Sequence, residues 1–499
     1  MEEKLKLLKE KLKLIRLYDH ALGILNFDFE TIVPSMSRED EADVLNYFGN
    51  EMFKLTTADD FKALVEDLHG MVGQMQPYDR LLVENLYDEL KKVKHISPEL
   101  DMERSEILSR SYNTWLSAKE HKDYNEFAPV FKEVIDINRK CVDLREDKLP
   151  DYYDNLLNDY EKDVLQADLD PFFAELKEGL VALLNRIKGS THTIRRDFLT
   201  RAVPIHKQDQ FSRYLLTLNG YEFRRGALAT TEHPFTSNVA RHDARVTTHY
   251  YENLFVSNIF SIIHEGGHAI FMQCQPAVDY DYFINDSISN GMHESVSRFY
   301  ENIIGRSKAY IHLIYPEFHR LFAEELGDVS EEELYEAVNI VEPSLIRTEA
   351  DEVTYGLHII IRYEMEKMLA AGTLRVEDAA AKWNELYREY LGIKVPDDAQ
   401  GILQDVHWTW GFGYFPSYAL GNCYNAMYFR RMRAEMDVDA LVRAGDMGAI
   451  KDWLTANVFA HANTLKPKEW LRELTGQSLS PTAFLDYLNA KYTDLYRLV

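Results

Sequence analysis

The chain has 499 residues and a mass of 58.2 kDa, and 46% of its residues are hydrophobic. This length and composition allow a large core without disulfides, and they exclude an intrinsically disordered, a collagen-like or a disulfide-stapled chain. Acidic residues outnumber basic ones by 82 to 56, so the net charge is −26. Because this charge repels phosphate backbones and anionic lipid, we expect no nucleic-acid or membrane partner.

The N-terminal segment predicts an amphipathic helix. Leu5, Leu8, Leu12 and Ile15 recur at spacings of three and four residues, which is the period of one helix face. We expect this face to pack on the protein rather than on a membrane surface. The segment lacks the unbroken apolar run of a signal peptide, and the three cysteines lack CxxC spacing. Both features favour a cytoplasmic protein with reduced thiols.

Helical periodicity continues along the chain. Residues 170–189 and 376–393 place apolar side chains at helical spacing, and both segments end near Gly or Pro. The clearest strand-like stretch is 243–255, which is rich in Thr, Val and aromatic residues. The sequence therefore predicts a mostly α-helical fold with a small β-sheet.

The chain offers no obvious domain boundary. No long Gly-, Ser- or Pro-rich linker divides it, and no internal repeat has a fixed period. We predict a single catalytic domain over residues 1–499. Within it, residues 1–200 form a mainly helical N-terminal part, and residues 201–499 carry a metal site.

The strongest chemical signal is an HExxH motif inside the apolar helical segment 260–271. At 3.6 residues per turn, His264 and His268 project from one helix face a turn apart, which lets both bind one tetrahedral zinc. Glu265 lies beside them, where it can take a proton from a metal-activated water.

Two glycines, Gly266 and Gly267, separate the ends of this motif. Each costs about 1 kcal/mol relative to Ala in a helix interior. We therefore expect either a close neighbour at this turn or space that is kept free for a substrate.

Glu294 is the candidate third ligand, since a catalytic zinc commonly has three protein ligands and one open position. It lies 26 residues after His268, in a segment, 291–302, that predicts a second helix. His293 is the alternative ligand. Neighbouring helix positions differ by about 100°, so only one of the two can face the metal squarely.

These blocks resemble the carboxypeptidase Taq family of metallocarboxypeptidases. HEGGHAIF and HESVSRFYEN carry the resemblance, and other blocks follow the family's order between about residues 20 and 430. The further blocks are ILNFDFETIVP (24–34), HPF (233–235), DARVT (243–247), IRTEAD (346–351), GILQDVHW (401–408) and GYFPSYALG (413–421). The chain departs from the family at Phe27 and Tyr300, where Trp is common, and at Val296, where Gln is usual. These departures concern groove shape and substrate preference, and they leave the candidate ligands untouched.

The resemblance implies a large helical body around a deep groove, with the small sheet near the active site. It implies a metal-dependent carboxypeptidase that releases residues one at a time from peptides with a free C-terminus, and a homodimer. It also implies one divalent metal per chain. We expect zinc, with cobalt as the alternative, because metal availability rather than ligand type decides between them.

The same resemblance offers candidates for binding the reacting carbonyl. His233, His407 and Tyr418 are the candidate donors to the oxyanion, and Tyr414 is an alternative to Tyr418. A histidine in these blocks could instead orient a neighbour, and a tyrosine could serve packing alone.

Arg347 is the candidate for binding the terminal carboxylate of the substrate. Its planar guanidinium can form a bidentate, charge-assisted pair with a carboxylate. The alternative is an ion pair with Glu349 or Asp351 in the same block.

Three other functions compete with a carboxypeptidase. An HExxH endopeptidase or oligopeptidase would also cut peptides without a free C-terminus. A helical di-iron carboxylate protein needs a second ExxH motif, which Glu66–His69 provides, but it leaves His264 without a role. A non-catalytic protein with a structural zinc would normally use four closed ligands, often thiolates.

Overall fold

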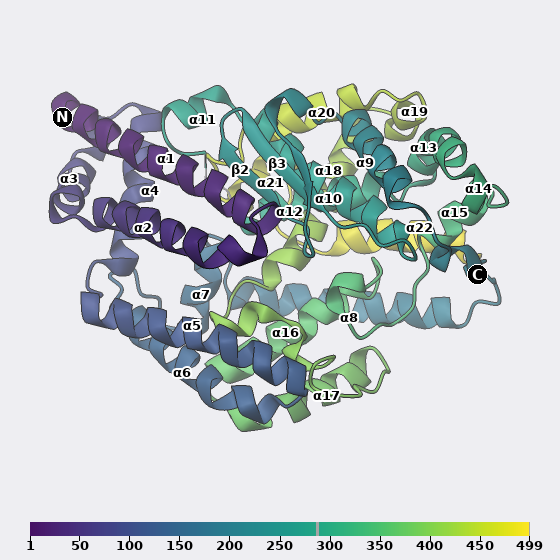
Figure 1. Cartoon of the computed structure of the whole chain (residues 1–499), viewed down its shortest axis with the longest axis horizontal. Helices are drawn as coiled ribbons and strands as arrows, with labels where there is room; N and C mark the ends of the chain where they lie inside the picture. Colours follow the sequence, from purple (N-terminus) through teal and green to yellow (C-terminus); the bar gives the residue numbers. More distant parts are fainter. Residues whose placement is uncertain (286–288, 499) are drawn as a thin grey trace.

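The computed structural model describes residues 1–285 and 289–498, and most of these residues are helical (Figure 1). The helices of the first half are α1 (Glu2–Thr31), α2 (Arg38–Thr57), α3 (Asp59–His69), α4 (Pro77–Val93), α5 (Pro98–His121), α6 (Tyr124–Asp143), α7 (Tyr152–Tyr160), α8 (Gln166–Lys188) and α9 (Ile205–Asn219). Those of the second half are α10 (Phe255–Cys274), α11 (Ala277–Asp281), α12 (Asn290–Arg298), α13 (Lys308–Leu321), α14 (Ala323–Leu326), α15 (Glu331–Ala337), α16 (Tyr355–Ala370), α17 (Ala379–Tyr390), α18 (Pro416–Glu435), α19 (Val438–Arg443), α20 (Met447–Leu454), α21 (Pro467–Thr475) and α22 (Thr482–Leu495). The strands are β1 (Leu228–Thr230), β2 (Thr236–Ala240) and β3 (Asp243–Thr248).

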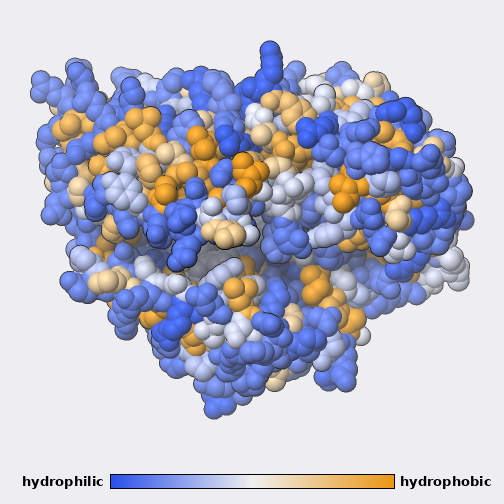
Figure 2. Space-filling model, viewed as in Figure 1, coloured by the Kyte–Doolittle hydropathy of each residue, from blue (hydrophilic) through white to orange (hydrophobic). Residues whose placement is uncertain are grey.

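The helices form an upper and a lower part in the view of Figure 1. The upper part contains α1, α2, the sheet and α10, and the lower part contains α5, α6, α16 and α17. The space-filling view shows the surface hollowed between the two parts (Figure 2). This recess agrees with the expected groove in a helical body.

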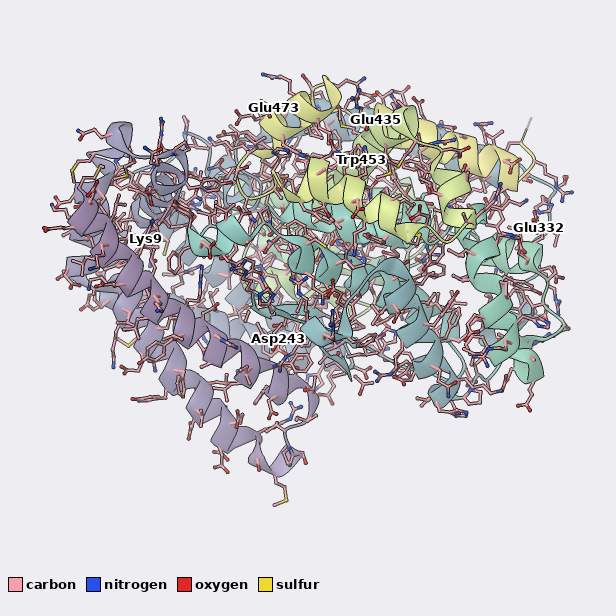
Figure 3. The ribbon with its side chains drawn as sticks, turned by 90° about the horizontal axis from the view of Figure 1, so that it is seen from above. Lys9, Asp243, Glu332, Glu435, Trp453 and Glu473 are labelled. Carbon is pink, nitrogen blue, oxygen red and sulfur yellow. The ribbon has the colours of Figure 1, made fainter. Side chains whose placement is uncertain are left out.

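The N-terminal helices have a small core of their own. Leu5, Leu8 and Leu12 of α1 are buried against side chains of α3 and α4, as the periodicity predicts. α2, by contrast, packs along α1 without burying any of its own side chains fully. Seen from above, α1 and α2 form a pair along one edge of the molecule, with Lys9 on α1 and Asp243 at the start of β3 labelled (Figure 3).

The predicted helices of the main body are present. Residues 170–189 lie in α8, and residues 376–393 form α17 after a short 3₁₀ turn, Val376–Asp378. α10, α16 and α18 are buried over most of their length, so they form the centre of the larger core. None of the helices among the described residues is both long and apolar enough to cross a bilayer.

The sheet is small and mixed, with β3 in the middle. β1 pairs with β3 in parallel, and β2 pairs with β3 antiparallel with one register shift. The expected strand over 243–255 ends at Thr248, so the longer prediction is wrong for its second half. Asn258 Nδ2 donates to Thr248 Oγ1 and to the carbonyl of His249, which turns the chain into α10.

Candidate active site

α10 presents the two motif histidines on one face. The ring centroids of His264 and His268 lie 5.0 Å apart, and their side chains are 18% and 16% exposed in an otherwise buried helix. A Cβ at Gly267 would lie 2.8 Å from the Cα of Ser297 on α12, and one at Gly266 would lie 2.7 Å from Leu216. The interpretation of the two glycines as a site of close packing is therefore confirmed.

This close packing brings Glu294 of α12 to the two histidines. Its Oε2 atom lies 3.8 Å from His264 Nε2 and 3.5 Å from His268 Nε2. One ligand atom from each of the three residues lies within 4.8 Å of the others, and no other group of this kind occurs in residues 1–285 and 289–498. His293 lies behind His268, with 2.6 Å between their Nδ1 atoms. The geometry thus favours Glu294 over His293 as the third ligand.

In each of the three clustered side chains, the nitrogen or oxygen atom that points away from the cluster contacts a neighbouring residue. His264 Nδ1 lies 2.9 Å from Glu301 Oε2, and Arg298 Nε donates to Glu294 Oε1 over 2.8 Å. His293 contacts the Nδ1 atom of His268 in the same way. The inner atoms, two Nε2 and one Oε2, are left to converge, and this donor set fits a divalent metal such as zinc.

The carboxyl groups of this cluster are held in the ionised form. Burial alone would raise the pKa of Glu294, but His264 and Arg298 hold it well below the usual range. Burial is likewise outweighed at Glu301, where Arg298 and His264 lower the pKa to about 2. Burial and the nearby His268 lower the pKa of His293 to about 3, so its ring is neutral at physiological pH. The cluster therefore offers negative charge to a cation.

Glu265 lies at the side of the cluster that faces the sheet. It is buried, and its Oε2 atom accepts a hydrogen bond of 2.6 Å from Thr236 Oγ1 on β2. The same hydroxyl lies 2.9 Å from the Glu265 carbonyl oxygen. β2 therefore fixes the orientation of this carboxyl group.

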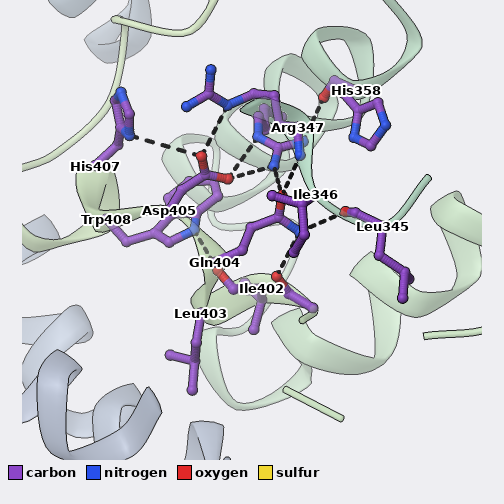
Figure 4. A network of polar contacts seen from close by, with 12 residues as sticks. Leu345, Ile346, Arg347, His358, Ile402, Leu403, Gln404, Asp405, His407 and Trp408 are labelled. Carbon is purple, nitrogen blue, oxygen red and sulfur yellow. Dashed lines mark hydrogen bonds and ion pairs between the residues drawn. The ribbon is translucent and has the colours of Figure 1, made fainter. Parts of the chain in front are cut away.

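Arg347 belongs to a second polar cluster, which surrounds Asp405 (Figure 4). Its Nε atom donates to Asp405 Oδ1 over 3.0 Å, and its Nη1 atom donates to the Tyr355 hydroxyl over 3.3 Å. The ion pair of Arg347 is thus with Asp405, and the alternative of a pair with Glu349 or Asp351 is wrong.

His407 and Tyr418 lie beside this cluster. His407 Nε2 is 3.3 Å from the Tyr418 hydroxyl, and the Arg347 guanidinium lies 4.8 Å from the centre of the Tyr418 ring. Burial lowers the pKa of His407 to about 3, so the ring is neutral. Burial raises the pKa of Tyr418 and of Tyr414, and the negative charge of Glu294 raises both further. The two clusters are therefore near neighbours.

Two groups of sequence candidates make no side-chain hydrogen bond or ion pair with either cluster among the described residues. His233 is exposed in the turn before β2, where its carbonyl oxygen accepts from Thr231 Oγ1. The second ExxH motif, Glu66–His69, lies in α3, and Glu66 pairs with Lys94 over 2.7 Å. Within the described ranges, this motif takes part in no metal-type cluster, which removes the geometric support for a di-iron protein.

Comparison with known proteins shows the family of the chain. Residues 7–492 match the family described as carboxypeptidase Taq (M32) metallopeptidase. The chain belongs to this family. It is 38% identical to carboxypeptidase 1 of Bacillus subtilis, covering 98% of this chain and 97% of the relative. It is 36% identical to thermostable carboxypeptidase 1 of Thermus thermophilus, over 96% of both chains. The crystal structure of the M32 carboxypeptidase from Deinococcus radiodurans R1 superposes with a TM-score of 0.95 at 31% identity, over 99% of this chain and 100% of that one.

The M32 chain is thus a metallocarboxypeptidase that requires a divalent metal and acts on peptides. Sequence reasoning missed the side chains that orient its candidate site. Glu294, Arg298 and Glu301 follow one another at spacings of four and three residues, so this part of the network is visible as a helix face. The contact from Thr236 to Glu265 has no such local signal.

Proposed function

We propose that this M32 chain is a zinc carboxypeptidase in which His264, His268 and Glu294 hold the metal. The observation that carries the proposal is the convergence of two Nε2 atoms and one carboxylate oxygen within 4.8 Å. Three protein ligands leave a position open for water, as expected of a catalytic rather than a structural site.

We propose Glu265 as the catalytic base and acid. When bound, the metal supplies Lewis-acid polarisation of the scissile carbonyl and activation of water. Glu265 Oε2 would accept the proton of the attacking water and return it to the leaving amine. The hydrogen bond from Thr236 holds this oxygen in place, and the partial burial of the site limits competing water.

The substrate side uses the second cluster. We propose that Tyr418 and His407 donate to the developing oxyanion, because both are neutral and lie next to each other. Arg347 would pair with the terminal carboxylate of the substrate. His233 and Tyr414 remain predictions from the resemblance, and the nearness of Glu294 to Tyr414 supports the second of them.

The test is mass spectrometry of peptide digests. A free-acid peptide should yield a ladder shortened from its C-terminus, and its C-terminally amidated twin should be cleaved far more slowly. A chelator should stop the reaction, and added zinc should restore it. Internal cuts in the amidated peptide would favour an endopeptidase, and two iron atoms per chain would favour the di-iron alternative.

Three finer properties are proposed with it. Elemental analysis of the purified protein tests for zinc, with cobalt as the alternative, and one metal per chain is expected. A homodimer predicts twice the monomer mass in light scattering. A cytoplasmic location, which the three free cysteines support, predicts that the protein fractionates with cytoplasmic markers.

A further inference from the structure

The Asp405 cluster buries more positive than negative charge. Asp405 is 4% exposed and lies between two guanidinium groups, those of Arg347 at 7% and Arg362 at 0% exposure (Figure 4). One carboxylate oxygen, Oδ1, accepts from Arg347, and the other, Oδ2, accepts from Arg362 Nε over 2.8 Å. A single acid therefore serves two cations.

Arg362 is enclosed by protein on all sides. Besides Asp405, its Nη1 atom donates to the carbonyl of His358 over 2.9 Å, and its Nη2 atom donates to Gln404 Oε1 over 2.8 Å. Its guanidinium lies 4.6 Å from the centre of the Trp383 ring. With its donors used inside the protein and no exposed surface, Arg362 has no way to touch a substrate.

The other titratable neighbours leave the excess of positive charge in place. Burial keeps the rings of His407 and His358 neutral by lowering their pKa values. Burial raises the pKa of Glu366 to about 8, so this carboxyl group is uncharged at neutral pH. Lys119 Nζ, 3.5 Å from the carbonyl of Gln404, adds a further positive group at the rim. An uncompensated buried charge is unfavourable, and an incoming anion would relieve it.

Arg347 is the member of the cluster that remains available. Its Nε atom is bound by Asp405, its Nη1 atom by the Tyr355 hydroxyl, and its backbone N–H by Gln404 Oε1. No acceptor in residues 1–285 or 289–498 pairs with its Nη2 atom. Since Asp405 is shared with Arg362, it compensates the charge of Arg347 only in part.

We propose that Arg362 is a positioning residue: by sharing Asp405 with Arg347, it leaves the charge of Arg347 only partly compensated and thereby sets the preference of the enzyme for a free terminal carboxylate. The inference rests on the proposed carboxylate-binding role of Arg347. Removing the charge of Arg362 leaves one acid for one cation, so Arg347 becomes neutralised inside the protein and attracts a substrate anion less strongly.

The test compares the inhibition constants of an N-acylated amino acid and its amide, together with kcat and KM for a free-acid peptide. R362Q should lower the preference for the acid over the amide by about tenfold or more, as expected for loss of a unit charge near a buried site. KM for the free-acid peptide should rise more than kcat falls. R362K, which keeps the charge, should stay within about threefold of the unsubstituted enzyme. Metal content should be unchanged in both.

Charge can also be altered without touching the buried arginine, in case R362Q does not fold. K119E places a negative group at the rim and should lower the same preference by a few fold. K122E, near the same helix end, alters an exposed lysine that pairs with Asp397 and should have no effect. R139Q is the matched control for R362Q, because Arg139 donates to the carbonyl of Ala370 outside the cluster.

The outcomes separate this inference from the proposed function. If the unsubstituted enzyme shows no preference for the free acid, or R347A keeps that preference, the proposed substrate side fails. If both behave as expected but folded R362Q or K119E retains the full preference, the inference about Arg362 is overturned. Failure of R362K to restore the preference would assign Arg362 a structural role instead.

Discussion

The metal-type cluster, which consists of His264, His268, Glu294 and their charged neighbours, is buried, as is the cluster around Asp405. The two clusters carry charge imbalances of opposite sign. With the imidazoles neutral, as metal binding requires, the carboxyl groups of Glu265, Glu294 and Glu301 outnumber the guanidinium groups of Arg298 and Arg306. Around Asp405, cations outnumber the single acid. Under the proposed function, each cluster is complementary to a ligand of the opposite charge, a divalent cation in one case and a substrate carboxylate in the other. Burial of an unequal number of charges thus prepares a site for a charged ligand.

The largest effect is expected from E265Q. The variant should lose about 10³-fold in kcat, within the range of general acid–base catalysis, because the amide accepts no proton. It should keep its metal, since Glu265 is not one of the three proposed ligands. Steady-state kinetics and elemental analysis test both parts. T236V, which removes only the hydrogen bond to Glu265, should lose less activity, and near-normal turnover by E265Q would refute its role.

E301Q tests how much the contacts that orient the three proposed ligands contribute to metal affinity. It replaces the carboxylate beside His264 Nδ1 by a neutral amide, so metal affinity should fall by about 10- to 100-fold. Competition with a fluorescent chelator measures this affinity without reference to activity. E332Q is the matched control, because Glu332 is exposed and pairs with Lys308, which is not a member of this cluster. Equal affinities of E301Q and E332Q would contradict the expectation.

E161Q tests a buried acid for which the described residues provide no neighbouring cation. Glu161 accepts from the Gly291 N–H and the Tyr424 hydroxyl, and burial raises its pKa from 4.5 to about 7. Because the folded pKa is the higher one, the protonated group costs nothing below pH 4.5, and stability is lost as the pH rises through 7.

Urea unfolding of the metal-free protein measures this effect. The free energy of unfolding should fall by about 1–3 kcal/mol more in the unsubstituted chain than in E161Q between about pH 5 and 8. Parallel pH profiles of the two proteins would show that Glu161 is charged throughout or solvated. Asp405 and Glu294, which have guanidinium partners, are the contrasting cases with lowered pKa values.

The sequence predicts those parts of the site that lie within one helix or repeat at helical spacing. His264 and His268 are placed by the period of α10, and Gly267 indicates the close approach of α12. Their difference in direction on one helix predicts that only one of Glu294 and His293 faces the metal, and the contacts of the folded chain favour Glu294. These features are local, so their geometry is fixed once the helix forms.

Contacts between distant segments lie beyond that reasoning. Asp405 and Arg362 are 43 residues apart, and their pairing depends on how α16 meets the loop before α18. Local charge offered Glu349 or Asp351 as the alternative partners of Arg347, whereas the fold supplies Asp405. Likewise, the composition of 243–255 is strand-like throughout, but Asn258 ends β3 early by binding the chain at Thr248 and His249.

The shallow packing of α2 has a dynamic consequence. This helix, which Figures 1 and 2 place along the upper rim of the recess, adds no fully buried side chain to either core. Segments with little apolar burial open at a small fraction of the global unfolding free energy. Amide hydrogens of residues 38–57 should therefore exchange with solvent well before those of α10, and transient detachment of this helix would widen the entrance while the catalytic face stays rigid.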